Sequence, residues 1–192
     1  MKTQNATLLR AGALLAVALT VGNLARAQMC SVTWTGNAGD GSWSTAANWS
    51  PHKVPGATSD VCIPTFTTAN GAGLDGSAQS ISVRSIQVAQ GGSLLFGSGK
   101  VSISTSLNNQ GLTSLFGTTL SAASIAMPNP GEIDVFDNSS ITSPAFSNTT
   151  GTLDVSPGGT LRLADNPVQL QNGNLSGGNW FVSGVLIIPS NI

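Results

Sequence analysis

The residues best suited to chemistry lie close together near the start of the chain, between positions 33 and 64. This segment, TWTGNAGDGSWSTAANWSPHKVPGATSDVCIP, contains Trp34, Trp43, Trp49 and the single histidine, His52. Tryptophan rings can stack on the apolar faces of sugars, or they can cover an open hydrophobic core. His52 has no second histidine to share a metal ion, so the sequence predicts an exposed turn residue at this position.

A second candidate site is a pair of carboxylates. Asp134 and Asp154 each stand three residues after a glycine, Gly131 and Gly151. In coils of twenty residues the two acids would lie about one strand spacing apart, roughly 5 Å. Such a pair either raises one pKa or recruits a cation, for which Ca²⁺ is the suitable ion, and it also fits a retaining glycoside hydrolase. The simpler interpretation is two solvated acids on an outer face, with no metal and no cofactor.

Glycines recur at intervals of twenty residues along most of the chain, at Gly71, Gly91, Gly111, Gly131 and Gly151. A glycine at a fixed place permits a tight corner between short strands, so we expect these five positions to form repeat corners. Apolar residues share the same frame four and ten places after the glycines: Leu95, Leu115, Val135, Val155 and Leu175, and Ile81, Val101, Ile141, Leu161 and Phe181.

The local patterns predict strands. Segments such as GTLDV and GTLRL alternate apolar and polar residues, and turn-forming pairs such as Asn-Gly and Pro-Gly separate them. Short strands at a fixed repeat predict an all-β fold, a right-handed parallel β-helix of about six coils over residues 71–192. The alternative is a β-sandwich, which requires no register between glycines. No T-x-T column repeats at twenty residues, so an ice-binding face is not predicted.

The first 27 residues have the pattern of an export signal. Lys2 and Arg10 are positive, residues 11–22 are apolar, and Ala25-Arg26-Ala27 matches a signal-peptidase site. The apolar run is too short for a membrane span, and no second long apolar segment follows it. We therefore expect an exported mature chain, located outside the cell or at the cell surface, with no membrane span.

Charged residues are scarce beyond the signal. Four Lys or Arg and eight Asp or Glu remain after residue 27, a net charge of −4. There is no basic patch, which argues against nucleic acid as a partner. Ser, Thr, Asn and Gly take the place of charged residues, a composition typical of exported β-rich proteins.

The two cysteines, Cys30 and Cys62, flank the tryptophan-rich segment. In an exported chain they most simply form a disulfide, which would stabilise the fold by roughly 3–4 kcal/mol. An open end of a solenoid exposes lumen residues and unpaired backbone groups, so it requires a cap. Because the segment directly precedes the first coil, we expect residues 28–70 to form a disulfide-bonded N-terminal cap whose three tryptophans cover the lumen.

The order of residues in this segment also supports a family resemblance. Trp34 to Gly36, Trp43, Asn48-Trp49, Val54-Pro55-Gly56 and Asp60 form a pattern that resembles the start of many exported bacterial β-strand-repeat proteins. These are adhesin-like and autotransporter-passenger-like proteins. The resemblance implies a parallel β-solenoid with a secreted or cell-surface role, commonly adhesion or matrix formation, and it transfers no catalytic residues.

Two functions remain open on the sequence alone. The first is a non-catalytic role in adhesion or as a scaffold, with extracellular glycans, matrix or other cell-surface proteins as partners. The second is a polysaccharide lyase or glycoside hydrolase that uses Asp134 and Asp154. The chain stops at the apolar stretch VLIIPSNI, so we also expect either a fragment of a longer solenoid or a subunit that covers this end.

Overall fold

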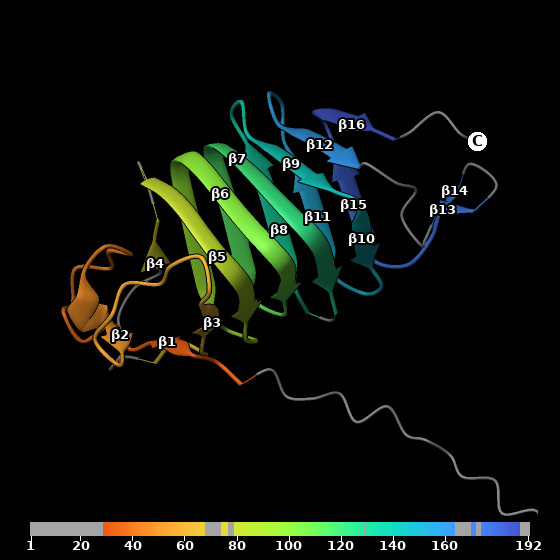
Figure 1. Ribbon diagram of the computed structural model, residues 1–192. Helices are drawn as coiled ribbons and strands as arrows, with labels where there is room; N and C mark the ends of the chain where they lie inside the picture. The colour runs from red at the N-terminus through yellow and green to blue at the C-terminus, as the bar shows by residue number, and fades with distance from the viewer. Residues whose placement is uncertain are drawn as a thin grey trace, which may run out of the picture.

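The protein is a parallel β-solenoid of about four turns in the computed structural model (Figure 1). Apart from a short 3-10 turn, η1 (Ala46–Asn48), the regular structure in the described part is β-strand. None of the described segments is a helix with the length and apolar character needed to cross a membrane. The structure describes residues 29–67, 74–76, 79–128, 130–163, 170–171 and 174–188.

Strand segments stack in three parallel ladders, which we name the first, second and third faces. The first contains β4 (Leu74–Asp75), the starts of β6 (Ser93–Asn109) and β7 (Leu112–Met127), β8 (Glu132–Phe136), β11 (Thr152–Val155) and β15 (Asn179–Val182). The second contains the start of β5 (Gln79–Val88), the middles of β6 and β7, β9 (Ser140–Ser143), β12 (Thr160–Leu163) and β16 (Val185–Ile187). The third contains β1 (Val32–Trp34), β3 (Asp60–Ile63), the ends of β5, β6 and β7, and β10 (Ala145–Asn148).

The described residues make four turns that contribute to all three faces, rather than the six coils expected from the sequence. These turns are residues 74–88, 93–109, 112–127 and 132–148. The following strands β11, β12, β15 and β16 extend only the first and second faces. Between them, β13 (Leu170–Gln171) and β14 (Asn174–Leu175) pair antiparallel in a separate small sheet, so Leu175 lies outside the predicted apolar column.

The core is the lumen enclosed by the three faces. Along β8, β11 and β12 every second residue is buried, because successive side chains of a strand point to opposite sides. Burial of each aliphatic side chain contributes about 1.5–3 kcal/mol. The lumen columns include Leu115, Val135 and Val155 on the first face, Ile81, Val101, Leu120, Ile141 and Leu161 on the second, and Ile86, Leu107, Ile125 and Phe146 on the third.

The length of a turn varies along the chain. Ser93 pairs with Leu112, an offset of nineteen, whereas Leu112 pairs with Glu132, an offset of twenty. Leu95 is therefore opposite Ser114 on the outside and does not join the Leu115 column. Phe181 pairs with Asp154 and is 57% exposed, so it also lies outside the column assigned to it from the sequence.

Three of the predicted corner glycines, Gly111, Gly131 and Gly151, lie where the chain enters the first face. The Thr152 amide donates to the Gly131 carbonyl at 2.8 Å, and a Cβ on Gly151 would lie 2.5 Å from that same oxygen. Close approach of the neighbouring turn, rather than a left-handed backbone, therefore requires glycine at these corners.

The other two predicted corners differ. Gly92 occupies the equivalent position in the second turn, since its carbonyl accepts the Leu112 amide at 2.9 Å. Gly91 is exposed in the turn between β5 and β6, with a φ of 75°, so it also lies at a corner, one residue before the position that stacks on Gly111. The nineteen-residue turn that follows accounts for this offset of one residue. Gly71 lies outside the described residues.

Replacement of Gly131 by alanine should destabilise the protein by about 2–3 kcal/mol, because the added Cβ would overlap the Asn109 carbonyl at the neighbouring corner of the stack. Gly56→Ala is the matched control, since nothing lies within 4 Å of the added atom. Urea unfolding of the two variants would measure the difference. Equal stability of both variants would contradict the close-approach explanation.

Candidate functional site

The three tryptophans of the N-terminal segment close the start of the lumen. Trp34, Trp43 and Trp49 are 1%, 1% and 0% exposed. The Trp49 ring meets Trp34 and Trp43 edge-on, with centroids 5.0 and 4.8 Å away, and its Nε1 donates to the Trp43 carbonyl at 2.7 Å. Trp43 also lies 6.2 Å from Phe96 in the second turn. The ring faces are thus occupied by protein and not by solvent, which leaves no exposed platform for a sugar.

Backbone hydrogen bonds continue the solenoid into this closing segment. The Trp43 amide donates to the Asp75 carbonyl at 2.9 Å, and the Asp75 amide donates to the Gly41 carbonyl at 2.8 Å. On the third face, β1 and β3 add two further strands, and β2 (Trp49–Ser50) pairs antiparallel with β1. The segment therefore satisfies backbone groups of the first turn as well as covering its side chains.

A buried asparagine organises the loop between the tryptophans. Asn48 is fully buried, its Nδ2 donates to Asp40 and to the Ser42 carbonyl, and its Oδ1 accepts the Ala38 amide at 2.8 Å. Thr45 donates its hydroxyl to Asp40 at 2.7 Å. The hydrogen bonds from Thr45, Ser42 and Asn48 lower the pKa of Asp40. These polar residues serve the shape of the loop.

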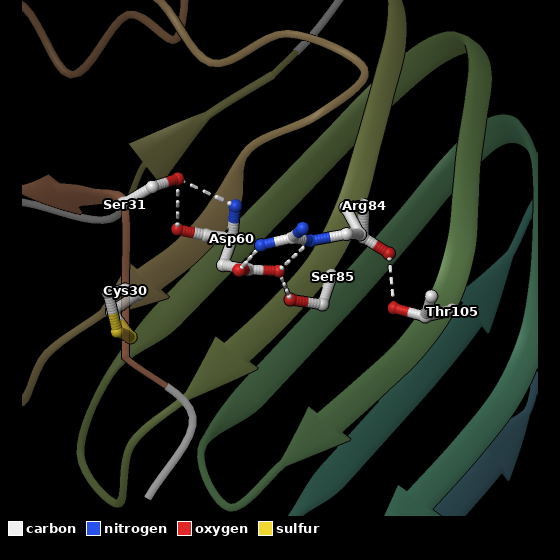
Figure 2. Close-up of polar contacts among 7 residues, drawn as sticks. Cys30, Ser31, Asp60, Arg84, Ser85 and Thr105 are labelled. Carbon is white, nitrogen blue, oxygen red and sulfur yellow. Dashed lines mark hydrogen bonds and ion pairs between the residues drawn. A yellow bond between two sulfur atoms is a disulfide. The ribbon is translucent and has the colours of Figure 1, made fainter.

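Asp60 joins the closing segment to the first turn, as Figure 2 shows. The Arg84 guanidinium binds both oxygens of Asp60, with Nε 2.8 Å from Oδ1, and Ser85 donates its hydroxyl to Oδ1 at 2.6 Å. The Ser31 hydroxyl accepts the Asp60 amide at 2.9 Å. This carboxylate raises the pKa of Arg84 through the hydrogen bond and the opposite charge. Asp60 and Asn48, which both belong to the Trp34–Asp60 sequence pattern, therefore have structural roles.

The disulfide predicted from the sequence is present. Cys30 and Cys62 are bonded, with their Cα atoms 5.7 Å apart. Cys62 lies on β3, and Cys30 precedes β1, which pairs with β3. The bridge thus connects the start of the described chain to the strand that contacts the first turn. Loop closure over 32 residues corresponds to about 3–4 kcal/mol of stabilisation.

His52 is exposed and takes no part in a polar cluster. Its backbone amide donates to the Trp49 carbonyl at 2.6 Å, and its φ of 56° places it in a turn. In the described part of the chain, no group of three or more His, Cys, Asp or Glu residues is arranged to hold a metal ion. The N-terminal segment therefore brings its tryptophans together but leaves its histidine apart.

Asp134 and Asp154 are direct neighbours on the outside of the first face. They pair in register between β8 and β11, as the glycine repeat predicts. Ser114 donates its hydroxyl to Asp134 at 3.2 Å. Burial raises the pKa of Asp134 to about 6, with smaller contributions from the negative charges of Glu132 and Asp154. One member of the pair thus holds a proton more readily than an ordinary carboxylate.

Aromatic rings and a shallow recess adjoin the acids. Phe116, which is 39% exposed, stacks on Phe136 with ring centroids 4.5 Å apart. A recess of about 330 Å³ borders Glu132 at the edge of this face. Its other lining residues come from the corners of three turns: Gly91, Gly92, Ser93, Gln110, Gly111, Leu112 and Pro130.

The second face carries hydroxyl columns that the sequence did not reveal. From β5 to β12 its outward positions form two ladders, which Val185 and Ile187 continue on β16: Ser80, Lys100, Thr119, Ser140 and Thr160, and Ser82, Ser102, Ser121, Thr142 and Arg162. The available signal was the paired pattern S-x-S, T-x-S and S-x-T on successive strands. Offsets of nineteen to twenty-one residues between these strands hide the columns from a search at exactly twenty.

The raised pKa of Asp134 predicts a pH-dependent loss of stability. Below pH 3.8 the group is protonated in both states; as the pH rises to about 6, only the folded state keeps the proton, so ionisation increasingly opposes folding. Asp134→Asn should therefore stabilise the protein at pH 8 by about 1 kcal/mol after allowance for solvent screening, and have no effect near pH 3. Denaturant unfolding at both pH values measures this. An equal effect at the two pH values would contradict it.

Comparisons of this chain with protein-family models, with curated proteins and with solved structures found no match. Three surfaces of the described structure could serve a function. These are the closed N-terminal end, the acidic first face and the hydroxyl-lined second face.

Proposed function

We propose that this protein is an exported β-helix that acts outside the cell or at the cell surface, in adhesion or as a structural rod, without catalysis. The observation that carries the proposal is that the tryptophan-rich segment closes the end of the solenoid. Its three aromatic residues are buried in closing the lumen, and its polar residues Asp40, Asn48 and Asp60 hold that closure in place. The segment is thus suited to building a rigid rod with exposed faces.

Two further features support an extracellular setting. The Cys30–Cys62 disulfide is of a kind that persists in oxidising compartments. Residues 1–27 have the composition of a bacterial export signal. The resemblance of the Trp34–Asp60 pattern to adhesin-like and autotransporter-like proteins points to the same role.

The exposed faces are suited to contact with large partners. Small polar residues occupy most outward positions of the second face, and the strands beneath them are hydrogen-bonded into a continuous ladder. Such a face offers extended area at little cost in side-chain entropy, because Ser and Thr lose few rotamers on contact. Glycans, matrix and cell-surface proteins are therefore the partners that we propose.

The purified protein should bind at least one of three surfaces: cultured cells, matrix proteins or an array of glycans. The expected result is saturable binding that is lost after reduction and unfolding of the protein, because a rigid face presents the contacts. Surface binding would be measured by interferometry or by labelled protein on cells. If none of the three surfaces is bound, the adhesive role is wrong and the structural rod remains.

A second candidate function is hydrolysis or lyase cleavage of a polysaccharide on the first face. The observation that favours it is the Asp134–Asp154 pair, in which one carboxyl has its pKa raised to about 6. A proton donor beside a second carboxylate is the arrangement that glycoside hydrolysis uses. Phe116 and Phe136 would supply an apolar surface next to the acids.

Release of reducing ends from a panel of polysaccharides, with and without Ca²⁺, tests this candidate. Activity that Asp154→Asn abolishes, while the variant keeps its melting temperature, is the result expected of an enzyme. Either no activity on any polymer or full activity of Asp154→Asn would exclude the pair as a catalytic site.

A further inference from the structure

We propose that the second face binds an extended acidic polysaccharide lying along the axis of the solenoid. This inference rests on the proposed adhesive function and names the ligand class and the surface that would serve it. The residues concerned are the outward ladders of the second face, which we name the hydroxyl ladders: Ser80, Lys100, Thr119, Ser140 and Thr160, and Ser82, Ser102, Ser121, Thr142 and Arg162.

The hydroxyls of these ladders are available to a ligand. All eight are at least partly exposed, and none of them makes a side-chain hydrogen bond within the described structure. Several hydroxyls on the other two faces do have internal partners, since Ser85 donates to Asp60, Ser114 to Asp134, and Ser124 to the Thr105 carbonyl. The eight outward serines and threonines of the second face thus have no internal hydrogen-bonding role, whereas Ser143, which points into the lumen from β9, donates to the Ala145 carbonyl.

The first and second faces carry charges of opposite sign, while Asp60 and Arg84 pair with each other beside the third face. Lys100 and Arg162 stand in the hydroxyl ladders, where the described positions include no carboxylate. Glu132, Asp134 and Asp154 all lie on the outside of the first face. A polyanion would therefore be repelled by the first face and attracted to the second, which selects an acidic ligand for the hydroxyl ladders.

The spacing of the ladders favours a polymer over a small molecule. Hydroxyls recur from turn to turn at the strand spacing, roughly 4.8 Å, from β5 to β12, with Lys100 and Arg162 in place of two of them and the apolar Val185 and Ile187 following on β16. Lys100 and Arg162 are three strand steps apart, so their separation along the axis is roughly 14 Å. A single sugar cannot contact both cations, whereas a chain of sugars can.

The chemistry of the face matches such a chain. Each serine or threonine hydroxyl can donate one hydrogen bond and accept others, so it suits the hydroxyl groups of sugar rings. Lysine and arginine form strong, charge-assisted hydrogen bonds with carboxylate or sulfate groups. Because most ladder side chains are small, a polymer can approach the backbone of the sheet along its whole length.

The test is binding of the purified protein to immobilised polygalacturonate, compared with the same polymer after chemical reduction of its carboxylates. Dextran sulfate and dextran form a second pair, which separates sulfate from carboxylate recognition. We expect saturable binding to at least one acidic polymer and about tenfold weaker binding to its uncharged counterpart. Weaker binding of the double variant Lys100→Gln, Arg162→Gln is also expected.

A matched pair of variants on β7 locates the surface. Ser121→Asp places a carboxylate in the hydroxyl ladder, whereas Ala126→Asp places one at a position on the third face that is also exposed. Ser121→Asp should weaken binding about tenfold, and Ala126→Asp should leave it nearly unchanged. Melting temperatures equal to that of the original protein would show that both variants are folded.

Three results would overturn the inference: no binding to either acidic polymer, equal binding to charged and uncharged polymers, or equal effects of Ser121→Asp and Ala126→Asp. Failure here differs from failure of the proposed function. A protein that binds cells or matrix proteins but neither acidic polymer keeps its adhesive role and loses this ligand. A protein that binds none of these surfaces loses both.

Discussion

The structure depends on the pairing of each turn with the next through backbone hydrogen bonds. Along the described ladders, strands pair in register with the neighbouring turn, which requires the turns to approach within one strand spacing, including at the corners. Gly111, Gly131 and Gly151 permit this approach, because a Cβ at any of them would meet a carbonyl oxygen of the turn before. The same requirement creates a problem at the ends, where partners are absent and lumen side chains would meet water. Corner glycines thus allow close pairing between turns, and the N-terminal closing segment supplies the partners and the cover that the first turn would otherwise lack.

This constraint explains why the most aromatic part of the chain is buried. Trp34, Trp43 and Trp49 look like a binding platform in the sequence, but the end of the lumen needs large apolar plates, and they supply them. Among the polar residues around them, Asp40 and Asn48 shape the loop, and Asp60 connects it to β5. We therefore propose the sides of the rod, whose residues are individually ordinary, as the functional surface, rather than the segment with the most distinctive residues.

Much of the fold could be predicted because a solenoid repeats. The glycine register, the alternating strands and the two cysteines indicated a parallel β-helix and its disulfide, and the stacking of Asp134 on Asp154 followed from the same register. Details that depend on local changes in turn length could not be predicted. Irregular register between Ile103 and Ser106, and a nineteen-residue offset at Ser93, shift positions without altering which side chains face the lumen. These shifts moved Leu95 out of its predicted column and concealed the hydroxyl ladders, whereas the offset of twenty-seven residues between Asp154 and Phe181 placed Phe181 outside its column.

The length of the rod can change without altering its closed N-terminal end. Each turn contacts mainly the turn before it and the turn after it, so stability is close to a sum of neighbouring contacts. Insertion or loss of a whole turn between β8 and β11 would leave the tryptophans, Asp60 and the disulfide in place, since all of them act on the first two turns. The hydroxyl ladders would gain or lose one rung at a time. Reach and number of contacts can therefore vary in evolution by small steps, while the part of the molecule that initiates the stack is inherited unchanged.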